Sequence, residues 1–119
     1  MNGFVGDQTA LAAANWGPGQ TPRAVIRAYA QVKLASLTAT FETDRTAGKS
    51  VWDGETWKKI TQALTEIQGG VHDDLFVVPL VQGGAGTSLN MNLNEAVVHL
   101  VVRDGGPALH PLNDVNRHQ

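Results

Sequence analysis

The sequence contains no cysteine, which excludes disulfides, thiolate-bound zinc and thiol nucleophiles. Charged residues make up only 17% of its 119 residues and aromatic residues 6%, while hydrophobic residues reach 42%. This composition argues against a disordered tail, and the length corresponds to one domain. Nine basic and eleven acidic residues give a net charge of −2, which excludes the basic surface of a nucleic-acid-binding protein.

Long apolar runs are also missing, since none approaches the roughly 20 residues of a membrane span. The first twenty residues lack a basic start followed by an apolar stretch, so we expect no signal peptide, no membrane partner and a cytoplasmic location. The four histidines do not have the spacing of metal ligands, and we expect no metal and no cofactor. His72 and His99 are isolated, which favours structural or surface roles.

Proline and glycine separate an N-terminal segment from a first helix. Residues 1–20 have few large apolar side chains, which predicts an extended arm. Thr21 can cap a helix and Pro22 has the φ of a first helical turn, so a helix is predicted to start there. Apolar residues recur at intervals of three and four as far as Phe41, and the helix is expected to end near residues 44–48.

A second helix is predicted to begin at Asp53, whose carboxylate can cap the first turn. Trp52 and Trp57 occupy the two positions of a hydrophobic staple, and Gly69-Gly70 ends the helix. We therefore interpret both tryptophans as core and staple residues, with a ligand role as the alternative.

Two further segments are less regular. Residues 75–81 form an apolar run, but Pro79 cannot donate to a β-ladder, which leaves an edge strand or a bent extended segment. Residues 92–104 have the pattern of an amphipathic helix, although their valines leave a strand as an alternative. Gly105-Gly106-Pro107 ends this segment.

Between these segments lies a glycine-rich stretch, residues 82–88, in which three glycines precede Thr87 and Ser88. Such a backbone can approach a ligand closely, and a helix starting directly after it would favour a bound anion such as a carboxylate. The stretch has neither the lysine of a phosphate-binding loop nor the spacing of a dinucleotide-binding loop. A purely structural turn remains the alternative.

Three asparagines, Asn90, Asn92 and Asn94, alternate with apolar residues after the glycines. Unpaired buried amides cost about 1–3 kcal/mol each, so these side chains are expected to have partners. They are either a capping network for the loop or donors to substrate oxygens.

The glycine-rich stretch, with Asn90-Met91-Asn92 and Asn94-Glu95, resembles the first signature region of the aspartase/class II fumarase superfamily. Outlying blocks are similar to other segments of that family: Gly6-Asp7-Gln8-Thr9 with Asn15-Trp16, Val32-Lys33 with Ala35, Glu66 with Gly69 or Gly70 and Phe76, and residues 110–116. The form Gly-Gly-Ala-Gly-Thr-Ser is closer to aspartate ammonia-lyases than to fumarases.

The resemblance implies a mainly α fold, the N-terminal domain of the aspartase/fumarase fold with a short β or extended element and without the central helical bundle. It divides this single domain into an extended arm (1–20), helices with a glycine-rich substrate loop (21–104) and the start of the second signature region (105–119).

The function implied is that of the N-terminal part of a lyase that reversibly eliminates ammonia from aspartate to give fumarate. A class II fumarase and an inactive fragment are the alternatives. The substrate-binding residues implied are Thr87, which donates to a substrate carboxylate, with Gly86, Ala85, Ser88 and Asn90. His110 and Asn113 fall where fumarases place a second dicarboxylate site.

No catalytic residue is implied within this chain, because the family's proposed serine base and its lysine belong to a later signature that the sequence lacks. The family builds each active site from three subunits of a homotetramer. The partners implied are therefore a small dicarboxylate and the other subunits, and we expect the 119 residues alone not to catalyse elimination.

Overall fold

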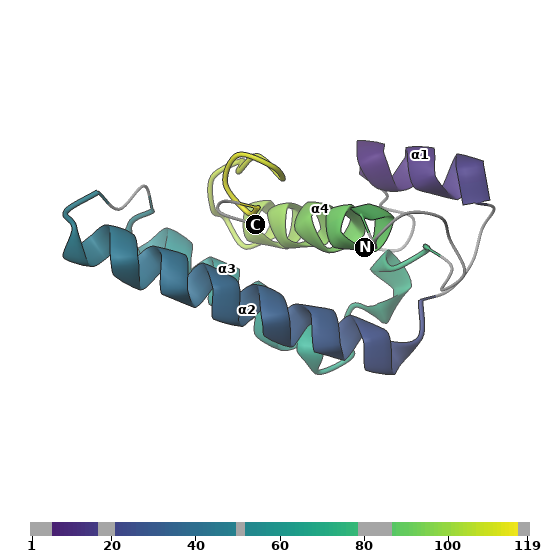
Figure 1. Cartoon of the computed structure of the whole chain (residues 1–119), viewed down its shortest axis with the longest axis horizontal. Coiled ribbons are helices and arrows are strands. Elements are labelled where there is room, and N and C mark those ends of the chain that lie inside the picture. Colours follow the sequence, from purple (N-terminus) through teal and green to yellow (C-terminus); the bar gives the residue numbers. More distant parts are fainter. Residues whose placement is uncertain (1–5, 17–20, 50–51, 79–86, 117–119) are drawn as a thin grey trace.

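The computed structural model describes residues 6–16, 21–49, 52–78 and 87–116, of which 12–16 are described for their backbone only. These ranges contain α1 (Asp7–Trp16), α2 (Arg23–Thr46), α3 (Gly54–Gln68), the 3-10 helix η1 (Asp73–Leu75) and α4 (Thr87–Arg103), and no strand. Helix α4 lies between α1 on one side and the pair α2 and α3 on the other (Figure 1). The prediction of a mainly α fold is confirmed.

Helix α2 begins directly after Pro22, whose φ of −58° matches a helical start, and ends at Thr46, as predicted. Thr21 does not cap it: its hydroxyl instead donates to the carbonyl of Val78 at 2.7 Å. The helix thus depends on its buried stripe more than on a cap. The buried residues are Ile26, Ala30, Lys33, Leu37, Thr40 and Phe41.

The start of α3 follows the sequence prediction closely. Oδ1 of Asp53 accepts a hydrogen bond from the Thr56 amide at 2.7 Å. The rings of Trp52 and Trp57 stack with centroids 5.8 Å apart, and Phe41 of α2 stacks on Trp57 at 4.7 Å. The tryptophans are therefore structural, and they join the end of α2 to the start of α3.

Helix α4 starts at Thr87, earlier than the predicted residue 92, and is a helix in spite of its valines. Leu93, Val97, Leu100 and Val101 are fully buried in the same core cluster as the apolar stripe of α3. Burying such side chains stabilises by about 1.5–3 kcal/mol each, whereas the helix propensity of valine costs well under 1 kcal/mol. None of the helices in the described ranges has the length and apolarity needed to cross a membrane.

The extended arm predicted for residues 1–20 is wrong over residues 7–16, which form α1. The carboxylate of Glu95 on α4 accepts hydrogen bonds from the amides of Gln8 and Thr9, at 2.9 and 2.8 Å, and from the Thr9 hydroxyl at 2.6 Å. A negative group is favoured at a helix N-terminus, where amides lack partners within the helix. Gly6 allows this approach, since a Cβ there would overlap the Glu95 carboxyl group.

The apolar run at residues 75–81 is not a strand where the structure describes it. Leu75 ends η1, and Phe76 is extended (φ −103°, ψ 104°). The Asn92 side chain accepts from the amide of Val77 at 3.1 Å and donates to the carbonyl of Leu75 at 2.9 Å. The Asn92 side chain thereby makes the kind of backbone hydrogen bonds that a neighbouring strand would make. Of the two predicted alternatives, the bent extended segment is the one that residues 76–78 adopt. Residues 79–81 lie outside the described ranges.

Replacing Glu95 by glutamine should lower the free energy of unfolding by about 2 kcal/mol, because an amide NH2 would face donors that now bind a carboxylate oxygen. Urea unfolding measures the change. The control, Glu42→Gln, alters an exposed carboxylate on α2 and should cost about 0.5 kcal/mol or less. Equal losses in the two variants would show that Glu95 does not hold α1.

Candidate functional site

The first turn of α4 carries three of the predicted substrate-binding residues. Thr87 opens the helix and is exposed, while Ser88 and Asn90 are half-buried. The amides of a first helical turn lack carbonyl partners within the helix and carry its positive dipole end. The helix start that an anion site requires is therefore present directly after the three glycines of the glycine-rich stretch. Ala85 and Gly86, the other two predicted residues, lie outside the described ranges.

Asn90 belongs to a polar cluster formed by three separate parts of the chain. Its Oδ1 accepts from Nζ of Lys33 on α2 at 2.9 Å, and its Nδ2 donates to Oδ1 of Asn116 at 3.0 Å. Oδ1 of Asn116 also accepts from Lys33 at 3.2 Å and from Nδ2 of Asn94 at 3.3 Å. We call these four residues the lysine–asparagine cluster.

Lys33 is the member of this cluster whose importance the sequence reasoning missed. Its residue surface is 3% exposed, and burial lowers the pKa of its ammonium group from 10.5 to about 8. A signal was available, because Lys33 lies within the apolar stripe between Ala30 and Leu37. A lysine on a buried stripe requires polar partners.

The expected roles of the three asparagines separate in the structure. Asn92 bonds to the backbone of Leu75 and Val77, so it neither caps the glycine-rich loop nor faces a substrate oxygen through these two bonds. Asn90 and Asn94 belong to the lysine–asparagine cluster, and Oδ1 of Asn94 is buried with no hydrogen-bond partner among the described residues. Of the three asparagines, Asn90 is the one that lies next to Thr87 on the same face of α4, because residues three apart are neighbours on a helix.

The residues predicted for a second dicarboxylate site lie in an exposed turn. Nδ1 of His110 accepts from the amides of Leu112 and Asn113, both at 3.1 Å, and Asp114 accepts from the His110 amide at 2.7 Å. The imidazole could therefore reach a ligand only through Nε2. The second site stays a prediction, but Asn116 connects its turn to the lysine–asparagine cluster.

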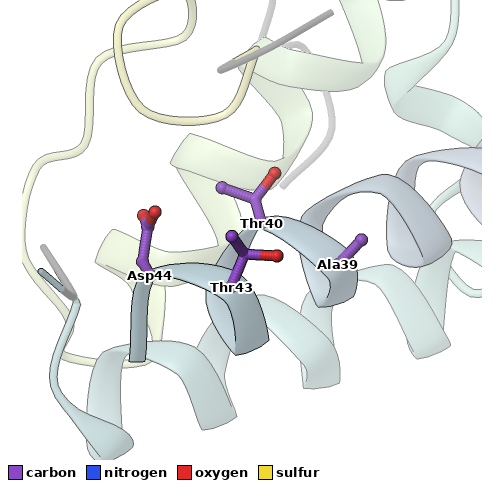
Figure 2. A pocket seen from close by; sticks show the side chains of 4 residues that line it. All are labelled: Ala39, Thr40, Thr43 and Asp44. Atoms are coloured by element: carbon purple, nitrogen blue, oxygen red, sulfur yellow. The ribbon is translucent and has the colours of Figure 1, made fainter. Parts of the chain in front are cut away.

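A surface hollow lies elsewhere, along the C-terminal half of α2. Figure 2 shows its lining side chains Ala39, Thr40, Thr43 and Asp44, all on that helix. None of them is a predicted site residue.

The histidines and carboxylates that the structure describes do not form a metal site. His72 is buried and bonded through Nε2 to Glu66 at 2.6 Å, which confirms its structural role. Within the described ranges, no three histidine or carboxylate side chains gather as a metal site would require.

These features define a class: a helical domain in which a buried helix starts directly after a run of glycines. No family profile matches the chain. A class II fumarate hydratase of Thermosynechococcus vestitus is 35% identical over 121 residues, covering 95% of this chain and 25% of that protein. An aspartate ammonia-lyase of Helicobacter pylori is 35% identical over 100 residues, covering 79% of this chain and 20% of that protein.

A solved structure titled fumarate lyase:delta crystallin, from Brucella melitensis, superposes with a TM-score of 0.79 at 33% identity. The superposition covers 97% of this chain and 28% of that one. The chain belongs to the aspartase/class II fumarase superfamily, as the residue blocks indicated. It spans at most about a quarter of the length of the curated relatives described here.

The free energy of unfolding should rise with pH between about 8 and 10.5. The folded chain releases the Lys33 proton near pH 8, whereas the unfolded chain keeps it to about 10.5, so the unfolded state binds more protons across this window. The burial penalty is fully present below pH 8 and relieved above 10.5, a gain of up to roughly 3 kcal/mol.

Urea unfolding from pH 7 to pH 10.5 measures this rise in the original chain and in Lys33→Met. The variant has no ammonium group at this position, so its stability should lack the rise. An equal slope in both proteins would contradict the assignment to Lys33.

Proposed function

We propose that this chain supplies the carboxylate-binding element of a lyase active site, with Thr87 as the principal contact. The observation that carries the proposal is the exposed Thr87 at the first position of α4, directly after the three glycines. Free amides, the helix dipole and a hydroxyl donor together favour a carboxylate. Gly86, Ala85, Ser88 and Asn90 are proposed to shape or support this contact.

The proposed reaction is the reversible elimination of ammonia from aspartate to give fumarate. A base removes the proton beside one carboxylate, which becomes a dianion before the amino group leaves and the double bond forms. Donors fixed where negative charge grows stabilise such an intermediate. In this proposal Thr87 and the amides around it bind one end of the diacid, and the base belongs to another part of the enzyme.

Hydration of fumarate to malate is the second candidate. It is favoured by the class II fumarate hydratase of T. vestitus, whose match extends over 95% of this chain. The glycine-rich motif favours aspartate, because its form Gly-Gly-Ala-Gly-Thr-Ser is closer to that of aspartate ammonia-lyases. In the elimination direction, from aspartate or from malate, both reactions begin by removing a proton beside a carboxylate, so the role proposed for Thr87 is the same.

The active enzyme is proposed to be a cytoplasmic homotetramer in which other subunits complete the site. The 119 residues alone should therefore produce no fumarate from either aspartate or malate. Ultraviolet absorbance of fumarate measures both reactions. Fumarate formation by the isolated chain would contradict this part of the proposal.

Reconstitution tests whether the chain is a working part of such an enzyme. The chain is mixed with the part of the T. vestitus fumarate hydratase that follows the matched region, and each half is also assayed alone. We expect activity only in the mixture, with aspartate and malate compared as substrates. A stable mixture without activity on either would favour the inactive-fragment alternative.

Replacing Thr87 by valine keeps the shape of the side chain and removes its donor. In the reconstituted enzyme this should lower kcat/KM by about tenfold to a hundredfold, the loss expected for one preorganised donor or somewhat less. Thr87→Ser should retain most activity. The matched control is Thr65→Val, an exposed helical threonine on α3 whose loss should leave kcat/KM unchanged. An unchanged rate in Thr87→Val would refute the role assigned to this hydroxyl.

A further inference from the structure

We propose that Lys33 is a positioning residue for the dicarboxylate site, acting through Asn90 and Asn116 to hold the first turn of α4 against the turn at residues 110–116. This inference rests on the proposed function and extends it to a residue outside the glycine-rich stretch. Lys33 comes from α2, which contributes none of the predicted substrate-binding residues.

The geometry of the cluster supports a positioning role. Nζ of Lys33 donates to Asn90 at 2.9 Å and to Asn116 at 3.2 Å, and these two asparagines bond to each other at 3.0 Å. A triangle of hydrogen bonds fixes three chain segments at one point. Asn90 lies one helical turn after Thr87, so any shift of this point moves the start of α4.

Packing alone does not require a lysine at this position. An apolar side chain on the stripe would avoid the cost of burying an ammonium group, and replacing buried charges by apolar residues is often neutral or stabilising. The ammonium group fixes the position of two segments relative to each other, because it donates to one acceptor on each of them. A methionine could fill the space but could make neither bond.

The charge of Lys33 also acts on the site at a distance. Asn90 and Thr87 are neighbours on α4 and Nζ bonds to Asn90, so a carboxylate bound at Thr87 would lie on the order of 10 Å from Nζ. Across that distance a positive charge favours a bound dianion by roughly three- to tenfold in affinity. Because burial lowers the pKa of Lys33 to about 8, this contribution should decline as the pH rises from 7 to 9.5.

The carboxylate, imidazole and guanidinium side chains on the surrounding elements do not imitate this decline. Carboxylates and imidazoles ordinarily complete their titration below pH 8, and arginine keeps its charge throughout. The groups concerned are Glu66 on α3, Glu95, His99 and Arg103 on α4, and His110 and Asp114 in the turn.

The test is the binding of succinate, an unreactive dicarboxylate probe, to the full 119-residue chain, followed by NMR from pH 7 to 9.5. We expect the affinity of the original chain to fall roughly three- to tenfold across this range. Lys33→Met should bind more weakly at pH 7 and show no pH dependence. The matched control, Lys58→Met, removes an exposed lysine of α3 and should follow the original profile.

The outcomes separate this inference from the proposed function. No succinate binding by the original chain at any pH would overturn the inference, whereas the proposed function is tested separately by the reconstituted enzyme. Binding that stays constant with pH would overturn the inference alone, and this measurement does not require the variant to fold. Equal profiles for the original chain and a folded Lys33→Met would do the same.

Discussion

The hydrogen bonds of the polar side chains on α4 are the constraint on which the described structure depends. This helix is buried on several sides, yet it carries Asn92, Asn94 and Glu95 in its interior. Buried amides and carboxylates without partners cost several kcal/mol, so the surrounding segments must bring partners to them. The first turn of α1, the segment at residues 75–77 and the turn at 110–116 each do so.

The same bonds explain why residue blocks far apart in the sequence resemble a single family. Gly6-Asp7-Gln8-Thr9 meets Glu95, and Lys33 meets Asn90 and Asn116. These contacts determine where α4 begins relative to its neighbours. Because the candidate carboxylate contact is the first residue of α4, these contacts also fix the place of that residue.

The burial of Lys33 disfavours its charged form, so a contribution to stability is a poor explanation for a lysine at this position. Its burial lowers its pKa to about 8, which means that the folded state disfavours the charged form at neutral pH. Stability alone therefore does not account for a lysine at this position. Its hydrogen bonds to Asn90 and Asn116, which hold two segments of the chain together, do. The bond to Asn90 holds the first turn of α4, where a negatively charged group is proposed to bind.

The sequence by itself determined the helices whose signals are local: the cap at Asp53, the tryptophan staple, the stripe of α2 and the glycine breaks. It also indicated the family, since the motif residues are adjacent in the chain. Only the tertiary structure decided that residues 7–16 are helical, that Leu75 and Val77 bond to the Asn92 side chain, and that Lys33 bonds to Asn90 and Asn116. In each of these cases the deciding partner lies at least 15 residues away. The spacing of residues within one segment of the sequence cannot predict such a contact.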